Sequence, residues 1–149
     1  MQPKYKTHTF TGKLNWTGGR TWDFSGETTP NIPGAPPKKF RGEDGKLTPE
    51  DLMLASVNTC MLSTFTSHMA TEGFEILSYE SDIEGILEHT DEHGFIFTKM
   101  ILKIRIEVES EDVKLLALDT LNKAHDGCWM SNSILAECII EPEITMHSQ

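Results

Sequence analysis

The chain has 149 residues, of which 13 are Lys or Arg and 23 are Asp or Glu, so its formal net charge is −10. A phosphate backbone or an anionic lipid surface repels such a protein, which argues against nucleic-acid and membrane-surface binding. Hydrophobic residues make up 38% and charged residues 24%, as is typical of a globular domain. The sequence has no apolar run of transmembrane length and no secretory signal at its start. We therefore expect a single soluble, cytoplasmic domain over residues 1–149.

The cysteines exclude several common site types. There are three, Cys60, Cys128 and Cys138, and no two of them form a CxxC pair. An odd and low number does not describe a secreted disulfide scaffold, and the spacing excludes a zinc finger or a thioredoxin-type motif. Each thiol therefore needs its own explanation.

The first third of the chain predicts a β-hairpin and a long loop. Residues 5–16 alternate apolar and polar side chains, and residues 21–25 do so again after a glycine turn at residues 17–20. Residues 26–46 are rich in Gly and Pro, which predicts a loop. This loop fits a lid or binding loop as well as it fits a solvated connector.

Residues 48–72 form the first predicted helix. Thr48 fits the N-cap position, and the proline and two acidic residues that follow suit a first helical turn. Between residues 52 and 70 the only ionisable side chains are Cys60 and His68. A helix that is apolar on all sides is typically buried, so we expect this one to be central.

The rest of the chain predicts two strands, a second helix and a last strand. Residues 76–89 and 95–109 alternate apolar and charged side chains, residues 136–146 are strand-like, and Ser110 fits the N-cap of a helix. The helix has a stripe of small and apolar residues: Val113, Ala117, Leu121, Ala124 and then Cys128. The order ββ–loop–α–ββ–α–β predicts an α+β fold with an antiparallel or mixed sheet and two main helices on one side.

Cys60 is the first candidate for chemistry. A cysteine in an apolar helix is more often a small core residue, and burial raises the pKa of such a thiol and makes it inert. To react, Cys60 needs a nearby cation. Arg20 is the best candidate because the glycines before it allow close approach, although Arg20 also reads as an ordinary exposed turn residue.

Glu50 could hold that arginine in place. It lies ten residues before Cys60 on the same helix, which is about 15 Å along the axis at 1.5 Å per residue. The two side chains therefore cannot share a site within one chain, and Glu50 must come from a second subunit if it serves Cys60. Its charge at a helix N-terminus also explains Glu50 without any function.

The remaining candidates are weaker. Cys128 is either a core residue or a second thiol that condenses with an oxidised first one. Cys138 lies within the last apolar strand and reads as structural. The histidines at the tip 89–93 suggest a metal site but fit a solvated turn better. The sequence has no phosphate loop, Ser-His-Asp signature or dinucleotide fingerprint.

Three blocks together resemble the OsmC/Ohr family of osmotically inducible and organic-hydroperoxide-resistance proteins. They are residues 17–20 (TGGR), residues 48–52 (TPEDL) with Cys60 ten residues after the glutamate, and residues 124–128 (AHDGC) followed by Ser-Asn at 131–132. The resemblance covers nearly the whole chain. It implies an OsmC-like fold and an intertwined homodimer, with the first helix central and two active sites near the interface.

The resemblance also implies roles for single residues. Cys60 matches the peroxidatic cysteine and Cys128 the resolving cysteine. Arg20 matches the arginine that stabilises the thiolate, and Glu50 the carboxylate that holds this arginine. Residues 129–130 are Trp-Met where the Ohr branch typically has Pro-Tyr, which favours an OsmC-like member over a typical Ohr.

The function implied is a thiol-dependent peroxidase in oxidative-stress defence. It would reduce organic hydroperoxides, and hydrogen peroxide as a further substrate, through a Cys60 sulfenate and a Cys60–Cys128 disulfide. We expect no metal or bound cofactor, only an external thiol reductant, a small dithiol or a lipoylated protein. Five side chains are candidates for an apolar substrate pocket or for plain core: Met53, Phe65, Met69, Trp129 and Met130.

Three other functions stay open at this point. The first is a non-catalytic dimer of the same fold that binds a small hydrophobic ligand. The second is an interaction dimer whose cysteines only pack. The third, and the most distant, is a Cys-His metal site.

Overall fold

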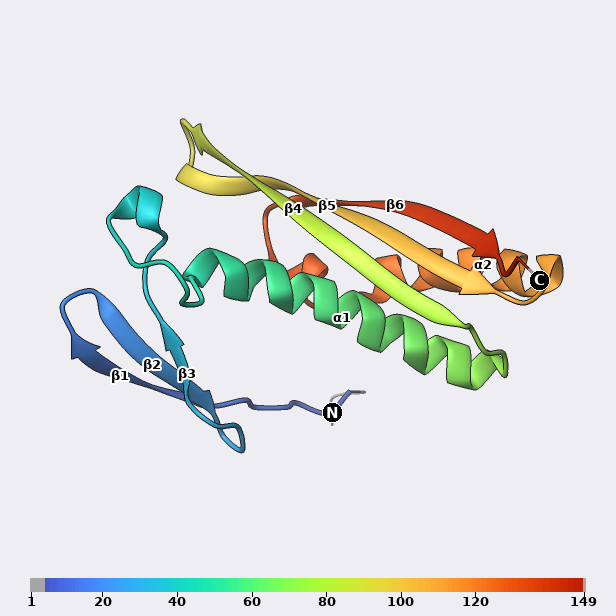
Figure 1. The fold of residues 1–149 in the computed structure, drawn as a ribbon, viewed down its shortest axis with the longest axis horizontal. Coiled ribbons are helices and arrows are strands. Elements are labelled where there is room, and N and C mark those ends of the chain that lie inside the picture. The colour runs from blue at the N-terminus through green and yellow to red at the C-terminus, as the bar shows by residue number, and fades with distance from the viewer. Residues whose placement is uncertain (1–4, 149) are drawn as a thin grey trace. The chain divides into compact units, whose positions relative to one another are not determined.

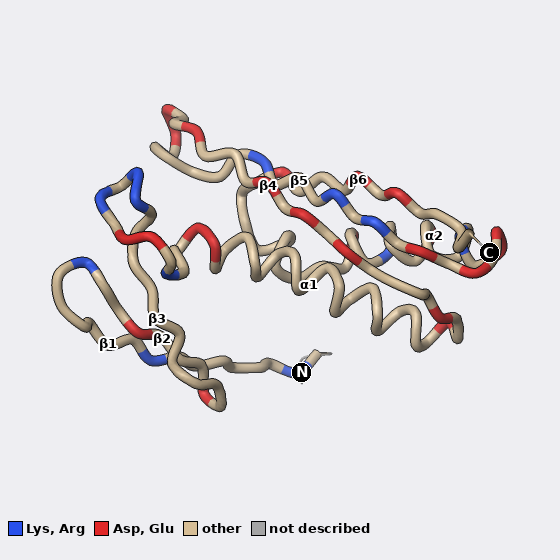
Figure 2. The backbone as a smooth tube through the Cα atoms, viewed as in Figure 1, with Lys and Arg blue, Asp and Glu red and all other residues tan. Residues whose placement is uncertain are grey.

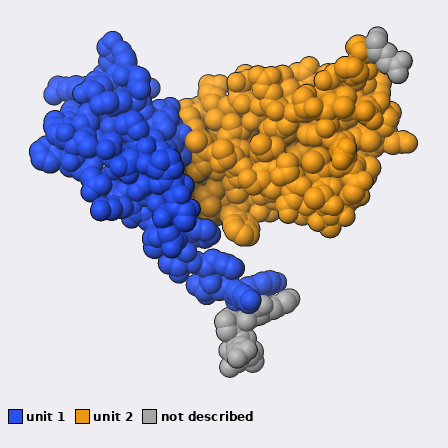
Figure 3. Space-filling model, turned by 60° about the horizontal axis from the view of Figure 1, so that its bottom comes forward, with its two compact units in different colours: residues 1–52 blue, residues 53–149 orange. Residues whose placement is uncertain are grey.

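The computed structural model describes residues 5–148. The chain divides into two compact units, residues 1–52 and residues 53–149, which Figure 3 colours separately. Each unit has its own three-stranded sheet (Figure 1). Within the described residues no helix is both long and apolar enough to cross a membrane.

The first unit is built on an antiparallel sheet in the order β1-β2-β3. Its strands are β1 (Gly12–Gly18), β2 (Thr21–Gly26) and β3 (Ile32–Gly34). The predicted hairpin is confirmed, although its first strand begins at residue 12 rather than at residue 5. The predicted loop 26–46 contains β3 and a short 3-10 helix, η1 (Lys38–Phe40). Alternation over three residues is too short a pattern to reveal a strand.

The turn between β1 and β2 requires its two glycines. Gly18 has φ 110° and Gly19 has φ 54°, a region that other residues rarely adopt. The Thr21 hydroxyl donates a hydrogen bond to the Gly18 carbonyl oxygen at 2.8 Å, and the hydroxyls of Thr17 and Thr21 lie 2.7 Å apart. The turn is therefore well defined, and it holds Arg20 exposed at its end.

Helix α1 (Pro49–Glu72) begins and ends where the sequence predicts. The Asp51 backbone N–H donates to the Thr48 hydroxyl at 3.0 Å, and the Thr48 N–H donates to the Asp51 carboxylate at 2.9 Å. This reciprocal pair satisfies two backbone donors that a helix start leaves free. At the other end Gly73 has φ 75° and its N–H bonds to the Met69 carbonyl at 2.9 Å.

The second unit has a mixed sheet in the order β4-β5-β6. β4 (Ser78–Thr90) and β5 (Gly94–Val108) are antiparallel, whereas β6 (Glu137–Met146) runs parallel to β5. A parallel pair needs a crossover connection, which is supplied here by α2 (Glu111–Gly127) and the short 3-10 helix η2 (Ser131–Ser133). The Ser110 hydroxyl caps α2 by accepting from the Val113 N–H at 3.3 Å. The α+β fold class is thus confirmed.

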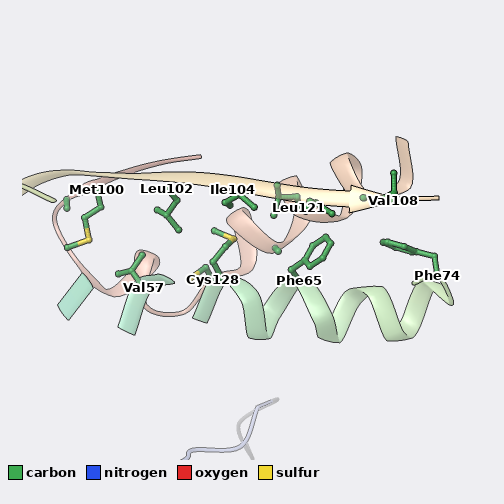
Figure 4. Packing of buried hydrophobic residues seen from close by; sticks show 14 residues of the cluster. Val57, Phe65, Phe74, Met100, Leu102, Ile104, Val108, Leu121 and Cys128 are labelled. Atoms are coloured by element: carbon green, nitrogen blue, oxygen red, sulfur yellow. The ribbon is translucent and has the colours of Figure 1, made fainter. Parts of the chain in front are cut away.

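One face of this sheet forms the core. Alternate residues of β5 are buried against α1 and α2, as predicted: Met100, Leu102, Ile104, Ile106 and Val108. The stripe on α2 is buried as well and ends at Cys128, which lies in the layer between α1 and the sheet (Figure 4). Charged residues recur along the three strands of this sheet (Figure 2), and Arg105 pairs with Asp82 at 2.8 Å and with Glu80 at 3.3 Å.

Helix α1 is buried along one stripe only, which differs from the expectation of a helix buried all round. Val57, Met61 and Phe65 are fully buried, whereas Leu62 on another face is 36% exposed. In the first unit the apolar side chains of β1 are also uncovered, with Leu14 60% and Trp16 73% exposed. One copy of the chain therefore leaves apolar surface that its sequence pattern marks as interior.

Leu87 is less covered than predicted. The alternation in residues 76–89 assigns it to the buried face, but it is 40% exposed. A β-bulge lies beside it, but its extra residue, Thr98, belongs to β5, so the alternation of β4 is not shifted. Leu87 lines a hollow together with Met53 of α1. Alternation therefore predicts the face on which Leu87 lies but not how completely that face is covered.

Candidate active site

Two of the three cysteines meet where α1 passes the end of α2. Cys60 lies in the middle of α1 and is half-buried, and Cys128 follows the last residue of α2 and is fully buried. Their side chains are within hydrogen-bonding reach of each other, and all three cysteines are free thiols. The structure thus brings together the two cysteines that the sequence singles out.

The segment after Cys128 is a tight turn, residues 128–133, held by its own polar side chains. The Cys128 carbonyl oxygen accepts from the Asn132 N–H at 3.0 Å and from the Ser131 hydroxyl at 3.1 Å. The Asn132 side-chain amide donates to the Asp126 carbonyl at 3.0 Å, which ties the turn back to α2. The Ser-Asn pair of the sequence therefore acts by shaping the backbone beside the thiols.

This turn directs backbone N–H groups at Cys60. Burial raises the pKa of the Cys60 thiol, but hydrogen bonds from the Met130 backbone, from Cys128, from Thr64 and from the Trp129 backbone lower it by more. The Thr64 hydroxyl is 4.0 Å from Cys60 Sγ. The net pKa lies below the ordinary value of a cysteine, because hydrogen bonds to a thiolate favour the charged form. These N–H donors are functional groups that side-chain patterns could not reveal.

No cation is among the groups that lower the pKa of Cys60 within a single chain. Backbone and side-chain donors within residues 53–149 already produce the shift. Arg20 belongs to the first unit, where it is exposed and makes no hydrogen bond or ion pair with any described residue.

Glu50 carries an unsatisfied polar atom. It lies in the first turn of α1, ten residues before Cys60 on a continuous helix, as the sequence predicts. Its Oε2 is buried and has no hydrogen-bond partner among the described residues. A buried carboxylate oxygen without a partner is costly, so this atom marks a place for a donor that the single chain does not supply.

A cavity of about 290 Å³ opens beside Cys60. It is lined by Cys60, Ser63, Thr64, Ser67, His68 and Trp129. Of the five side chains predicted as an apolar pocket, only Trp129 lines this cavity. Phe65 is fully buried in the core, and Met53 and Met69 are partly buried and pack against this core. Three small hydroxyl residues of α1, for which no role was predicted, make up half of the lining: Ser63, Thr64 and Ser67.

A second hollow in the same unit is apolar. It measures about 430 Å³ and is lined by Met53 of α1, residues 95–97 of β5, Leu87 and residues 133–136. Leu135 and Phe95 are each 70% exposed on this surface. None of its lining residues is a cysteine, so it is separate in composition from the cavity beside Cys60.

Cys138 has the environment of a structural thiol. It is half-buried on β6, and burial, with a smaller contribution from the charge of Cys128, raises its pKa. Its Sγ lies 3.8 Å from the Ala136 carbonyl oxygen. Cys138 is therefore protonated under conditions in which Cys60 begins to ionise.

The histidines form no metal centre in the part of the chain that the structure describes. No group of three or more His, Cys, Asp or Glu side chains there is arranged to hold an ion. The tip 89–93 is a hairpin turn in which the Thr90 hydroxyl accepts from the His93 N–H at 3.1 Å. This arrangement matches the solvated turn that the sequence favours.

A family model described as OsmC-like protein matches residues 42–143. The chain belongs to the OsmC-like protein family. Its site residues Glu50, Cys60 and Cys128 lie within the matched range, whereas Arg20 lies before it. The family includes proteins named for organic hydroperoxide resistance.

Other OsmC-like proteins share this fold. The chain is 27% identical to the uncharacterized protein YmaD of Bacillus subtilis, over 93% of this chain and 95% of that one. An OsmC-like protein of unknown function from Vibrio cholerae superposes with a TM-score of 0.83 at 17% identity, over 92% of this chain and 100% of the other. An organic hydroperoxide resistance protein OsmC from Legionella pneumophila gives a TM-score of 0.67 at 21% identity, over 97% and 100%.

The lowered pKa of Cys60 predicts its order of reaction with a neutral alkylating agent. Iodoacetamide should modify Cys60 first. Its labelling rate should rise with pH, and the midpoint, the pH at half of the maximal rate, should lie below that of an ordinary thiol, because only the thiolate reacts. Cys138 should react with a midpoint above it. Labelling rates at each cysteine, followed by peptide mass spectrometry between pH 5 and 10, measure both.

A matched variant tests the cause. Asn132→Ala should move the Cys60 midpoint upward because it loosens the turn that aims the N–H donors. Asn58 lies on α1, as Cys60 does, but its side chain accepts from the Ser81 hydroxyl at 2.7 Å and does not contact the site. Asn58→Ala should therefore leave the Cys60 midpoint unchanged. A wild-type midpoint at or above that of Cys138 would contradict this description of the site.

Proposed function

We propose that this protein is a thiol-dependent peroxidase that reduces organic hydroperoxides. The observation that carries the proposal is a thiol of lowered pKa, Cys60, in hydrogen-bonding reach of a second thiol, Cys128, at the wall of a cavity. A reactive thiol with a second cysteine beside it is suited to reversible oxidation.

The reaction proceeds in three balanced steps. The Cys60 thiolate attacks one peroxide oxygen, the O–O bond breaks, and the alkoxide leaves and takes up a proton to become the alcohol. Cys60 is then a sulfenic acid. The Cys128 thiol attacks its sulfur, a disulfide forms and water leaves. An external dithiol reduces the disulfide and is itself oxidised, which restores both thiols.

The N–H donors of the 128–133 turn serve two of these steps. An ordinary thiol with a pKa of about 8.5 is only a few per cent ionised at pH 7, and each unit of lowering raises that fraction up to tenfold. The same donors lie where negative charge passes from sulfur to oxygen during attack. Fixed N–H groups at such a place stabilise the transition state without reorganising.

We infer that Arg20 and Glu50 complete this site across a homodimer interface. The buried and unpartnered Oε2 of Glu50 suits a guanidinium, which the resemblance supplies from Arg20. Ten residues of helix separate Glu50 from Cys60, about 15 Å, so the pair would serve the Cys60 of the other subunit. The uncovered apolar surface of α1 and β1 favours a second copy as its cover.

The physiological setting follows from the same proposal. The name of the Legionella pneumophila relative, an organic hydroperoxide resistance protein, supports a role in oxidative-stress defence. The location that we propose for it is the cytoplasm. Trp129 and Met130 favour the OsmC-like branch over a typical Ohr. The reductant is a small dithiol or a dihydrolipoyl group, and no metal or bound cofactor takes part.

A second candidate function is ligand binding without catalysis. The apolar hollow around Met53 and residues 95–97 is large enough for a small hydrophobic molecule. Under this alternative the cysteines only pack, and peroxide would leave them unchanged.

Two cysteine variants separate these functions. Cys60→Ser should abolish peroxide consumption, because serine at neutral pH offers no comparable nucleophile. Cys128→Ser should retain the first reduction and trap Cys60 as a sulfenic acid or a higher oxide, detected by dimedone labelling and peptide mass. Full activity in Cys60→Ser would refute its role, and a normal disulfide in Cys128→Ser would assign resolution to Cys138. Cys138→Ser is the matched control and should turn over like the wild type.

Subunit complementation tests the shared site. Glu50→Ala and Cys60→Ser, each inactive alone, should regain about one quarter of wild-type activity when co-expressed, because random pairing of a two-fold dimer gives one intact site in half of the dimers. Arg20→Ala with Cys60→Ser should behave in the same way. Activity that stays at the level of the single variants would contradict a site shared by Arg20 or Glu50 of one subunit and Cys60 of the other.

A further inference from the structure

One face of α1 leads from Cys60 to a histidine. The cavity lining includes Cys60, Thr64, Ser67 and His68. Thr64, Ser67 and His68 follow Cys60 on α1 by four, seven and eight residues. Such spacings place side chains on one face of a helix. His68 is eight residues beyond Cys60, which puts it about 12 Å farther along the axis. Helical side chains lean toward the N-terminus, so the His68 ring reaches back into the cavity.

Among the lining residues that one chain contributes, His68 is the only one that can carry a positive charge. The lining holds no carboxylate, and among the described residues the His68 side chain has no hydrogen-bond or ion-pair partner. Glu72, one turn farther on, is bound elsewhere: Lys123 lies 2.8 Å from it and the Thr120 hydroxyl donates to it at 3.2 Å. In a chain of net charge −10, an unpartnered imidazole in this cavity is suited to donate a hydrogen bond to an anion.

The chemistry of the wall narrows the kind of anion. One imidazole near the C-terminal end of α1 offers a single donor, whereas phosphate sites usually gather several basic groups or a helix N-terminus. The Ser63 hydroxyl already donates to the Thr59 carbonyl at 2.9 Å. A monovalent carboxylate therefore fits better than a phosphate.

We propose that His68 anchors the carboxylate of the small molecule that reacts at Cys60. The molecule would lie along α1 with its reactive end at the Cys60 sulfur and its carboxylate at the His68 ring. This inference deepens the proposed peroxidase function, and the carboxylate belongs either to the hydroperoxide or to the thiol reductant. It makes His68 a determinant of specificity and not a participant in bond breaking.

A protection experiment tests the anchor without any peroxide. Octanoate should slow the alkylation of Cys60 by iodoacetamide, and methyl octanoate at the same concentration should slow it much less. His68→Gln should raise the half-protecting concentration of octanoate about tenfold, since it removes a charged hydrogen bond. His68→Lys should restore protection, and His89→Gln, an exposed histidine of the β4–β5 hairpin, should protect like the wild type.

Chain length supplies a second readout. Protection by linear monocarboxylates should be strongest for chains that span the distance between Cys60 and His68, up to about 12 Å, and weaker for acetate. Equal protection by octanoate in the wild type and in His68→Gln would overturn the anchor. So would equal protection by the ester, because a merely structural histidine would not distinguish the two.

Turnover assays assign the source of the carboxylate. One arm compares a hydroperoxy carboxylic acid with its methyl ester, and the other compares dihydrolipoic acid with dihydrolipoamide, each in the wild type and in His68→Gln. In each arm we compare kcat/KM for the acid with kcat/KM for its neutral counterpart. If His68→Gln lowers this ratio about tenfold through KM, the compound of that arm is the one whose carboxylate His68 binds. An unchanged ratio in both arms refutes the anchor. Failure of the wild type to reduce any hydroperoxide refutes the peroxidase function, while the protection result still decides the anchor.

Discussion

The site depends on the contact between Cys60 on α1 and the turn that begins at Cys128. This contact exists because both helices pack on one face of the β4-β5-β6 sheet, so that the buried stripe of α2 runs directly into Cys128. Cys128 is fully buried, and it therefore has one side of α1 as its neighbour rather than solvent. The core that stabilises the second unit is thus also what holds the two thiols together.

The turn solves a conflict that any reactive buried thiol faces. An apolar surrounding excludes water from the cavity but raises the pKa of a thiol and keeps it protonated. Here the Trp129 and Met130 backbone groups, with the Thr64 and Cys128 side chains, offset the effect of burial on Cys60. Cys138, which lacks these donors, keeps a raised pKa. The pKa values of two cysteines of the same chain therefore shift in opposite directions because of the hydrogen bonds that each receives.

Much of the fold could be predicted from local sequence patterns. The limits of α1 follow from Thr48 and Gly73, because capping chemistry is local, and the buried face of β5 follows from strict alternation. The 40% exposure of Leu87 could not be predicted, since alternation assigns a face of the sheet without showing whether that face is covered. The partner of the uncovered face of α1 could not be predicted either. An apolar pattern predicts that a surface is buried, but it does not show which element or subunit covers that surface.

The sequence could predict which cysteines form the candidate site, but not which groups set the pKa of Cys60. The positions of Cys60 and Cys128 follow from motif spacing, and the chain folds them together. The sequence points to a cation as the activating group because side chains are what a sequence displays. The N–H groups that lower the Cys60 pKa belong to the backbone, whose direction emerges only when Ser131 and Asn132 close the turn. Arg20 and Glu50 keep the part that we propose for them, completing the site from a second subunit.

The most direct measurement of this account is the mass of the protein after one equivalent of organic hydroperoxide. Reduced wild-type protein should lose two hydrogens per chain, and peptide mapping should place the loss in a Cys60–Cys128 link that a dithiol reverses. Unchanged masses and thiol counts under excess hydroperoxide would contradict it.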